Sequence, residues 1–170
     1  MSTATVSMAS LGTVGLTCPT PVSTHDRIVL GHGSGGKLSA QLFRERILPH
    51  FQNEVLQRQE DGAVVTLGGA QIVLSTDTFV VQPLEFPGGD IGSLAVHGTI
   101  NDIAMMGARA AHLTVGFVIE EGLPTVVLDR IVRSMAAAAR AMNVTIVAGD
   151  TKVVERGKGD GLFINTTGIG

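Results

Sequence analysis

The order of apolar and polar residues along the chain predicts three helices. The clearest of them opens at Leu123-Pro124 and ends near Asn143, because proline is well placed in the first turn of a helix. Its apolar positions are spaced by three and four residues in turn, as on one helical face: Leu128, Ile131, Val132, Met135, Ala139 and Met142. A second helix is predicted over residues 91–106, and a third ends at Pro49.

Short apolar runs bounded by glycine, aspartate or proline predict the strands. They occupy residues 27–30, 63–67, 70–76, 110–119, 144–148 and 162–170. The pair Gly68-Gly69 between two of these runs predicts a hairpin. Strands and helices alternate unevenly around it, so we expect an α+β fold in which a mixed or antiparallel sheet carries helices on one face. This domain is expected to fill residues 26–170, and residues 1–25 are expected to form a flexible tail.

Composition limits the functions that such a domain can have. Hydrophobic residues make up 44% of the 170 positions and charged residues 16%, which is typical of a globular chain. With no Trp, no Tyr and a net charge of -3, the chain offers neither stacking platforms nor positive charge to a nucleic acid. Cys18 is the only cysteine, which excludes an internal disulfide and favours a cytoplasmic location. Charges or glycine clusters interrupt every apolar stretch, so no membrane-spanning segment is expected.

The glycine-rich run Gly31–Lys37 is the first candidate for ligand binding. Four glycines in six residues let backbone N–H groups approach a phosphate, and the following helix adds its positive end. The spacing matches neither the P-loop nor the dinucleotide pattern. A flexible connector therefore remains the alternative to phosphate binding.

Asp102 is a second candidate because it is predicted to lie on an apolar face of the helix over 91–106. That face spans an arc of roughly 100° and consists of Ile91, Leu94, Ala95, Gly98, Asp102 and Met105. A carboxylate in an apolar stripe must be paired, hydrogen-bonded or metal-bound. A salt bridge to Arg109 is the structural alternative, but Gly98 one turn away would let a ligand approach, so we favour a functional role.

Asp77 and Asp150 share another pattern, in which an aspartate follows a predicted apolar strand and precedes a threonine. Ligand sites gather where strands give way to loops, although either aspartate alone is better explained as a strand terminator. Asp61 lies in an ordinary Asp-Gly turn. Several separated carboxylates without a cluster of His or Cys suggest a hard cation such as Mg²⁺, held together with phosphates that Lys37 and Lys152 could neutralise.

Seven short runs, taken in order, resemble the HypE family of hydrogenase maturation factors, the carbamoyl dehydratases. They are His32–Gly36, Ser75–Val81, Phe86–Gly92, Gly98–Asp102, Glu120–Pro124, Gly149–Val154 and Phe163–Thr166. Each run is weak by itself, but the ordered set is highly specific and covers residues 28–170. The resemblance implies a fold similar to the N-terminal domain of aminoimidazole-ribotide synthetase. It also implies a homodimer in which the sheets of two chains join into a β-barrel with ATP near the interface.

The resemblance further implies where ATP and Mg²⁺ would bind. Asp61 and Asp102 would hold the metal ion. The residues that would contact ATP are Gly33, Ser34, Gly35, Gly36, Lys37, Asp77, Thr78, Asn101, Asp102, Gly149, Asp150, Thr151 and Lys152. The substrate cysteine of the family lies at a C-terminus that this sequence does not include, so no catalytic residue is assigned.

The implied reaction is the ATP-dependent dehydration of a cysteine S-carboxamide to a thiocyanate, which supplies the cyanide ligands of [NiFe] hydrogenase. The implied partners are the carbamoyltransferase HypF and the HypC–HypD scaffold complex. Because the sequence ends inside a predicted strand, without the family's second domain, we expect these 170 residues alone not to complete turnover.

Two alternatives to this function stay open. One is another ATP-dependent synthetase of the same superfamily, although a selenophosphate enzyme would be expected to carry cysteine or selenocysteine near Gly31–Lys37, which has none. The other is a dimerisation or docking module without turnover.

Overall fold

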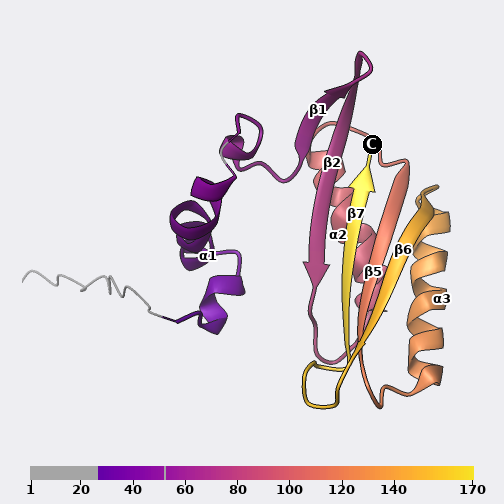
Figure 1. Cartoon of the computed structure of the whole chain (residues 1–170). Helices are drawn as coiled ribbons and strands as arrows, with labels where there is room; N and C mark the ends of the chain where they lie inside the picture. Colours follow the sequence, from indigo (N-terminus) through magenta and orange to yellow (C-terminus); the bar gives the residue numbers. More distant parts are fainter. Residues whose placement is uncertain (1–26, 52) are drawn as a thin grey trace, which may run out of the picture. The chain divides into compact units, whose positions relative to one another are not determined.

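The computed structural model describes residues 27–51 and 53–170. The chain divides into two compact units, Met1–Glu45 and Arg46–Gly170, and each is described by itself (Figure 1). The predicted tail over 1–25 lies outside the described residues.

The described part of the first unit is helical. It contains the 3-10 helix η1 (Leu30–Gly33) and the helix α1 (Lys37–Leu42). α1 continues as a π-helix, η2 (Phe43–Ile47), whose last two residues are the first two of the second unit. The predicted strand over 27–30 is wrong: Leu30 is 96% exposed and already belongs to η1. A short apolar run forms a strand only where another strand pairs with it, and the glycines that follow this run turn the chain instead.

The second unit is built on a five-stranded sheet in the order β1-β2-β7-β5-β6 (Figure 1). Its strands are β1 (Ala63–Leu67), β2 (Ala70–Phe79), β5 (His112–Glu120), β6 (Thr145–Val154) and β7 (Leu162–Ile169). All neighbours pair antiparallel except β5 and β6, which are parallel. The short strands β3 (Glu85–Phe86) and β4 (Gly89–Asp90) form a separate pair. Two 3-10 turns, η3 (Leu48–His50) and η4 (Leu56–Arg58), precede β1.

The hairpin between β1 and β2 confirms the prediction from Gly68-Gly69. Leu67 and Ala70 are the last paired residues, so these glycines are the whole turn. Both have positive φ, at 58° and 86°. Such a turn strongly favours glycine because a side chain is strained there.

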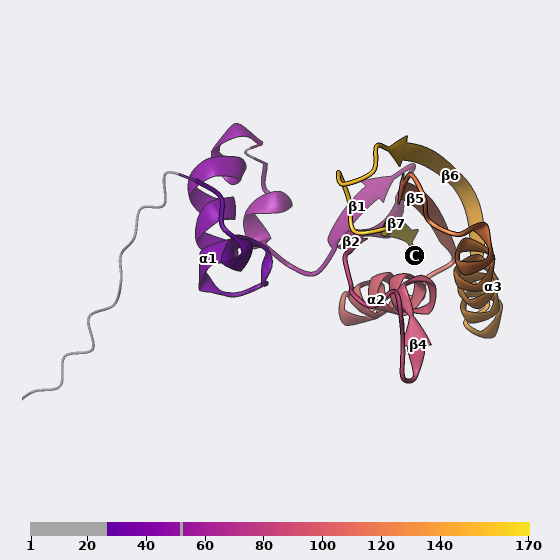
Figure 2. The ribbon, with the colours of Figure 1, turned by 90° about the horizontal axis from the view of Figure 1, so that it is seen from below.

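The helices α2 (Ile91–Met105) and α3 (Thr125–Ala141) lie on the same face of the sheet (Figure 2). This arrangement confirms the predicted α+β class with helices on one face. Asn143 ends the second of these helices as predicted, with a φ of 55°. The core lies between helices and sheet, and its fully buried members include Ile91, Val96, Ile103, Leu113, Ile131, Met135, Leu162 and Ile164.

Two strands run further than the sequence pattern predicted. β2 continues through Asp77 to Phe79, and β6 continues through Asp150 to Val154. The expectation that both aspartates follow the end of a strand is therefore wrong. Pairing with β7 and β5 keeps these polar segments extended, and that long-range pairing is invisible in a local pattern.

Among the helices of the described ranges, none is both long enough and apolar enough to cross a lipid bilayer.

Candidate functional site

One edge of the sheet is open beside the second half of β2. β1 starts at Ala63, which pairs with Leu74, so within the described part of the chain the residues of β2 beyond Leu74 pair only with β7. Alternation along a strand places Ser75 and Asp77 on the face that α2 covers. The Asp61-Gly62 turn precedes β1 directly and therefore reaches this edge as well.

Ser75 occupies the centre of this edge. Its side chain is 6% exposed. Its Oγ lies 2.9 Å from the backbone carbonyl oxygen of Asp61 and 3.0 Å from Oδ2 of Asp102 on α2. One serine hydroxyl therefore connects the turn before β1 with the helix, although 40 residues separate the two aspartates in the sequence.

Asp77 lies on the same face as Ser75, beside α2. Partial burial raises the pKa of its carboxyl group, and the charge of Asp102 raises it further. Gly98 makes this approach possible. A Cβ atom at that position would lie 2.7 Å from the ring of Phe79 and 3.8 Å from Oδ2 of Asp77. The glycine thus lets helix and strand bring two carboxylates together.

Asp102 does not lie in the middle of a buried stripe, as the helical arc suggested. Met105 from that arc is 73% exposed, and Leu94 is exposed too. The buried residues of α2 are Ile91, Gly92, Ala95, Val96, Thr99, Ile100 and Ile103. Asp102 is half-buried at the border of this face, and its partner is Ser75. The alternative salt bridge to Arg109 is not formed within the described residues.

Buried hydroxyl groups hold α2 on the sheet, and a capping box stabilises its first turn. The Oγ1 atoms of Thr99 on α2 and Thr166 on β7 lie 2.6 Å apart, and both residues are fully buried. Thr166 also donates to the carbonyl oxygen of Ala95 at 3.1 Å. At the start of the helix, Asp90 accepts from the backbone N–H of Ser93, whose hydroxyl accepts from the backbone N–H of Asp90. The bonds to Thr166 fix the position of α2 on the sheet, whereas the capping box stabilises the first turn of the helix, far from Asp102.

Thr78 and Asp150 lie on the opposite face of the sheet. The pairing register aligns Thr78 with Asn165, Asn165 with Gly116, and Gly116 with Asp150. Side chains of such a row share one face, and Asp77, the neighbour of Thr78, points to the other. Asp150 is also three strands away from Thr78, which corresponds to about 14 Å at the usual strand spacing. We call the open edge beside Ser75, with Asp61, Asp77 and Asp102, the acidic edge. The structure therefore does not bring Asp150 to the acidic edge.

Lys152 forms an ion pair with Asp150 on this second face. Its Nζ lies 2.6 Å from Oδ2 of Asp150, and both side chains are well exposed. This hydrogen bond is the main reason why the pKa of Asp150 is lowered. Two neighbours have backbone roles: at Gly149 a Cβ atom would lie 2.7 Å from the carbonyl oxygen of Val115, and Thr151 pairs with Phe117.

The glycine-rich run belongs to the first unit. Gly35 has a φ of 73°, and its N–H donates to the hydroxyl of Ser39 at 2.9 Å. The hydroxyl of Ser34 donates to the carbonyl oxygen of Gly31 at 2.8 Å. This part of the run is thus held by internal hydrogen bonds. No side chain of the described residues forms a hydrogen bond or ion pair with Gly33, Gly36 or Lys37.

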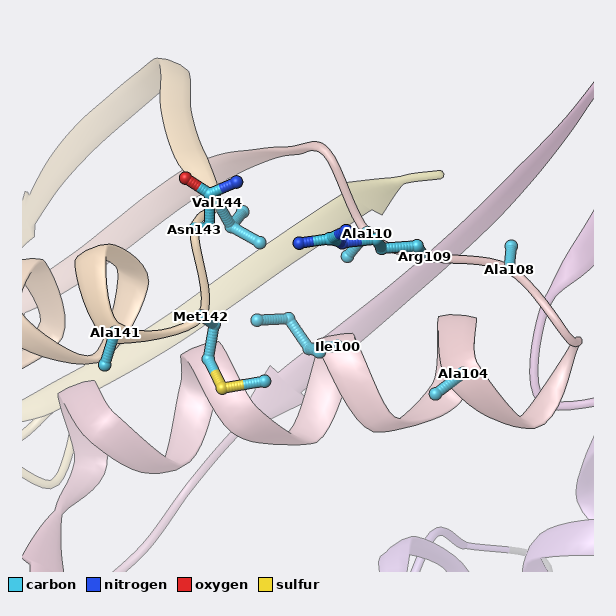
Figure 3. A pocket seen from close by; sticks show the side chains of 9 residues that line it. All are labelled: Ile100, Ala104, Ala108, Arg109, Ala110, Ala141, Met142, Asn143 and Val144. Carbon is cyan, nitrogen blue, oxygen red and sulfur yellow. The ribbon is translucent and has the colours of Figure 1, made fainter.

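A pocket of about 350 Å³ lies between the C-terminal ends of α2 and α3 (Figure 3). Figure 3 shows the side chain of Arg109 reaching toward Asn143 and Val144 in this pocket. The pocket is lined by Ile100 and Ala104, which lie two positions either side of Asp102 and so face another side of the helix. The pocket is therefore separate from the acidic edge. Helix C-termini also carry partial negative charge, which disfavours phosphate in this pocket.

The acidic edge fits a hard cation that arrives with phosphate oxygens. Mg²⁺ usually takes one or two carboxylates together with waters and substrate phosphates. Asp77 and Asp102 offer two carboxylates near enough for the charge of Asp102 to raise the pKa of Asp77. Within 27–51 and 53–170, no three Asp, Glu, His or Cys side chains are close enough to hold a metal ion by themselves. Asp61 reaches the edge through its carbonyl oxygen, and its side chain is exposed.

Sequence reasoning missed Ser75 and Asn165 as members of the site region. Asn165 donates to the backbone carbonyl oxygen of Asp77 at 2.9 Å and to the hydroxyl of Thr78 at 3.0 Å. The alternation Val73, Ser75, Asp77 could have placed Ser75 beside Asp77 on the buried face. No local signal pairs Asn165 with β2, because that contact spans 87 residues.

The second unit is thus an α+β domain with a mostly antiparallel sheet, two helices on one face and two carboxylates near an open edge of that sheet. Residues 59–170 match the family model described as AIR synthase related protein, N-terminal domain, and the chain belongs to this family. The carbamoyl dehydratase HypE of Cupriavidus necator is 55% identical over 161 residues. That alignment covers 94% of this chain, so it reaches into residues 1–25, and it covers 46% of the relative.

Solved structures show the same likeness. The chain is similar to a crystal structure of a HypE–HypF complex, with a TM-score of 0.71 and 55% identity over 76% of this chain and 41% of that one. It is also similar to a crystal structure of HypE in complex with ATP, with a TM-score of 0.59 and 52% identity over 85% of this chain and 43% of that one. The chain thus spans less than half the length of these relatives.

Proposed function

We propose that this chain is the ATP-binding half of an ATP-dependent carbamoyl dehydratase in [NiFe] hydrogenase maturation. The observation that carries the proposal is the 55% identity with a carbamoyl dehydratase along nearly the whole chain. The crystal structure of a relative in complex with ATP supports the choice of nucleotide. In the reaction, ATP would phosphorylate the amide oxygen of a cysteine S-carboxamide and leave as ADP. Loss of that phosphate, together with the remaining proton on nitrogen, would then give the thiocyanate.

In this proposal the acidic edge binds the cation and the phosphates. Asp102 and Asp77 hold Mg²⁺, which when bound neutralises charge on the transferring phosphoryl group. Burial and the charge of Asp102 raise the pKa of the Asp77 carboxyl group. A cation between the two carboxylates removes their repulsion. Asp61 lies in the turn at this edge, and we propose that its exposed side chain joins the metal ligands only when the cation binds, since no three carboxylates of the described residues are already close enough. The edge of β2 beyond Leu74 stays open for the nucleotide.

The remaining predicted contacts lie elsewhere on the chain. Thr78, Asp150 and Lys152 share the second face of the sheet, and the glycine-rich run belongs to the first unit. We infer that a homodimer joins such faces of two chains into a barrel, so that ATP contacts come from more than one surface. The likeness to a HypE–HypF complex supports HypF as a partner. HypC–HypD as further partners and a cytoplasmic location are part of the same proposal.

Equilibrium binding of ATP with and without Mg²⁺ tests this function. We expect Asp102→Asn to lower the affinity in Mg²⁺ by roughly tenfold or more, since loss of a metal carboxylate or its support costs about 10–100-fold. The matched control is Asp129→Asn on the exposed side of α3, which should bind as the unchanged chain does.

Two results would contradict the proposal. Unchanged ATP affinity in Asp102→Asn would favour a docking module in which nucleotide binding is vestigial. ATP binding that depends on Asp102, without carbamoyl dehydration once the chain is extended to the full length of its relatives, would favour another synthetase of the superfamily.

A further inference from the structure

We propose that Ser75 is a positioning residue, which orients the carboxylate of Asp102 and holds the Asp61 turn against it. The inference rests on the proposed function, because it concerns the cation site of the same edge. Ser75 itself does not touch the cation. It acts through the two groups that its hydroxyl contacts.

The geometry gives one hydroxyl proton two acceptors. Ser75 Oγ is 2.9 Å from the Asp61 carbonyl oxygen and 3.0 Å from Asp102 Oδ2. A serine hydroxyl has one hydrogen to donate and rotates to suit its surroundings. The two bonds therefore share or exchange that hydrogen, and both acceptors must stay within reach of the same oxygen.

Burial turns this contact into a restraint. Because Ser75 is 6% exposed, water has little access to replace it. Donation to Oδ2 selects one orientation of the Asp102 carboxylate and leaves Oδ1 for a cation. Partners of this kind, one shell out from a metal, orient its ligands and tune its affinity.

The same hydroxyl also links two ligand-bearing segments. Asp61 precedes β1 and Asp102 lies on α2, and Ser75 on β2 contacts both. Gly62 lets the turn pack this closely, since a Cβ there would lie 2.9 Å from the carbonyl oxygen of Leu74 and 3.6 Å from Cβ of Ser75. Loss of the hydroxyl frees the turn and the carboxylate together.

The test measures how much Mg²⁺ strengthens the binding of a non-hydrolysable ATP analogue to the full chain. We expect Ser75→Ala to reduce this Mg²⁺-dependent gain about tenfold and to leave the Mg²⁺-free affinity unchanged. The control is Ser93→Ala, which removes the same atom and two hydrogen bonds, with the backbone N–H and the carbonyl oxygen of Asp90, from the other end of α2. It should keep the full gain.

A double-mutant cycle separates positioning from mere structural support. If Ser75 acts through Asp102, Ser75→Ala causes little further loss of the gain in a chain that already carries Asp102→Asn. Ser75→Cys keeps the volume and offers a weaker donor, so it should lose less than Ser75→Ala and guards against poor folding of the alanine variant.

Distinct results overturn the two proposals. If the unchanged chain gains no affinity from Mg²⁺, the proposed function fails, and the role of Ser75 fails with it. If Asp102→Asn loses the gain but Ser75→Ala keeps it, or if Ser75→Ala weakens binding equally with and without Mg²⁺, only the positioning role is overturned.

Discussion

At the scale of single residues, Asp77 joins a cost in stability to the role in cation binding that we propose for it. Its carboxyl group accepts no hydrogen bond from the described residues, and burial followed by the charge of Asp102 raises its pKa. A carboxylate that is disfavoured in the folded chain is a natural place for a cation, because the cation relieves both causes of the shift.

We therefore predict that Asp77→Asn stabilises the fold at neutral pH while weakening Mg²⁺-dependent ATP binding. Because the folded-state pKa is raised, the stability associated with the protonated group is present below about pH 3.9 and is lost as the pH rises through the folded pKa. A neutral amide avoids this loss. Thermal unfolding at several pH values checks the sign: the gain should be present at pH 7 and vanish in acid. Asp129→Asn is the exposed control, and equal melting temperatures for Asp77→Asn and the unchanged chain would contradict the explanation.

At the scale of elements, the contact between α2 and β7 decides where the acidic edge is assembled. Thr99 and Thr166 are polar residues in a core of aliphatic side chains, and each is the hydrogen-bond partner of the other. Apolar burial alone would let the helix slide or rotate slightly on the sheet. The hydroxyl pair gives the packing a definite register.

We predict that Thr166→Val lowers the free energy of unfolding by about 1–3 kcal/mol, since it leaves the buried hydroxyl of Thr99 without its partner. Replacing both threonines with valine should cost less than the sum of the two single changes, because no orphaned hydroxyl remains. Urea unfolding of the four chains of this cycle measures both quantities. Additive losses would show that the two hydroxyls do not depend on each other.

At the scale of the whole molecule, the second face of the sheet is the main open surface of the second unit. Within the described residues of that unit, α2 and α3 both lie on the other face (Figure 2). The open face has apolar ends and a polar centre, in which Asn165 donates to Thr78 and Thr167 donates to Thr76. Such a surface is suited to a second sheet, which supports the proposed homodimer.

We predict that Val118→Asp on this face weakens self-association by roughly 30-fold, the effect of losing about 2 kcal/mol at an interface. Val118 is 37% exposed. Val132→Asp provides a matched control on the exposed side of α3, where the valine is 41% exposed. Sedimentation equilibrium over a range of concentrations measures the dissociation constants. A dimer that tolerates Val118→Asp as well as Val132→Asp would place the interface elsewhere.

The sequence by itself determined the features that depend on neighbours along the chain. The Gly68-Gly69 hairpin, the extent of α2 and the end of α3 at Asn143 follow from turn chemistry and helical spacing, which act over a few residues. The candidate aspartates were also visible as residue types. How these aspartates are arranged in space was not visible in the sequence, because each belongs to a different element.

Only the tertiary structure decided which of those aspartates meet. Pairing with distant strands extended β2 and β6 beyond their apolar runs. Packing of α2 left Met105 73% exposed and Asp102 half-buried. The tertiary structure also brought Ser75 between Asp61 and Asp102, and it placed Asp150 on the opposite face. The physical reason is that strand length, buried helical face and side-chain grouping are set by packing between segments far apart in the chain, whose energy no local pattern contains.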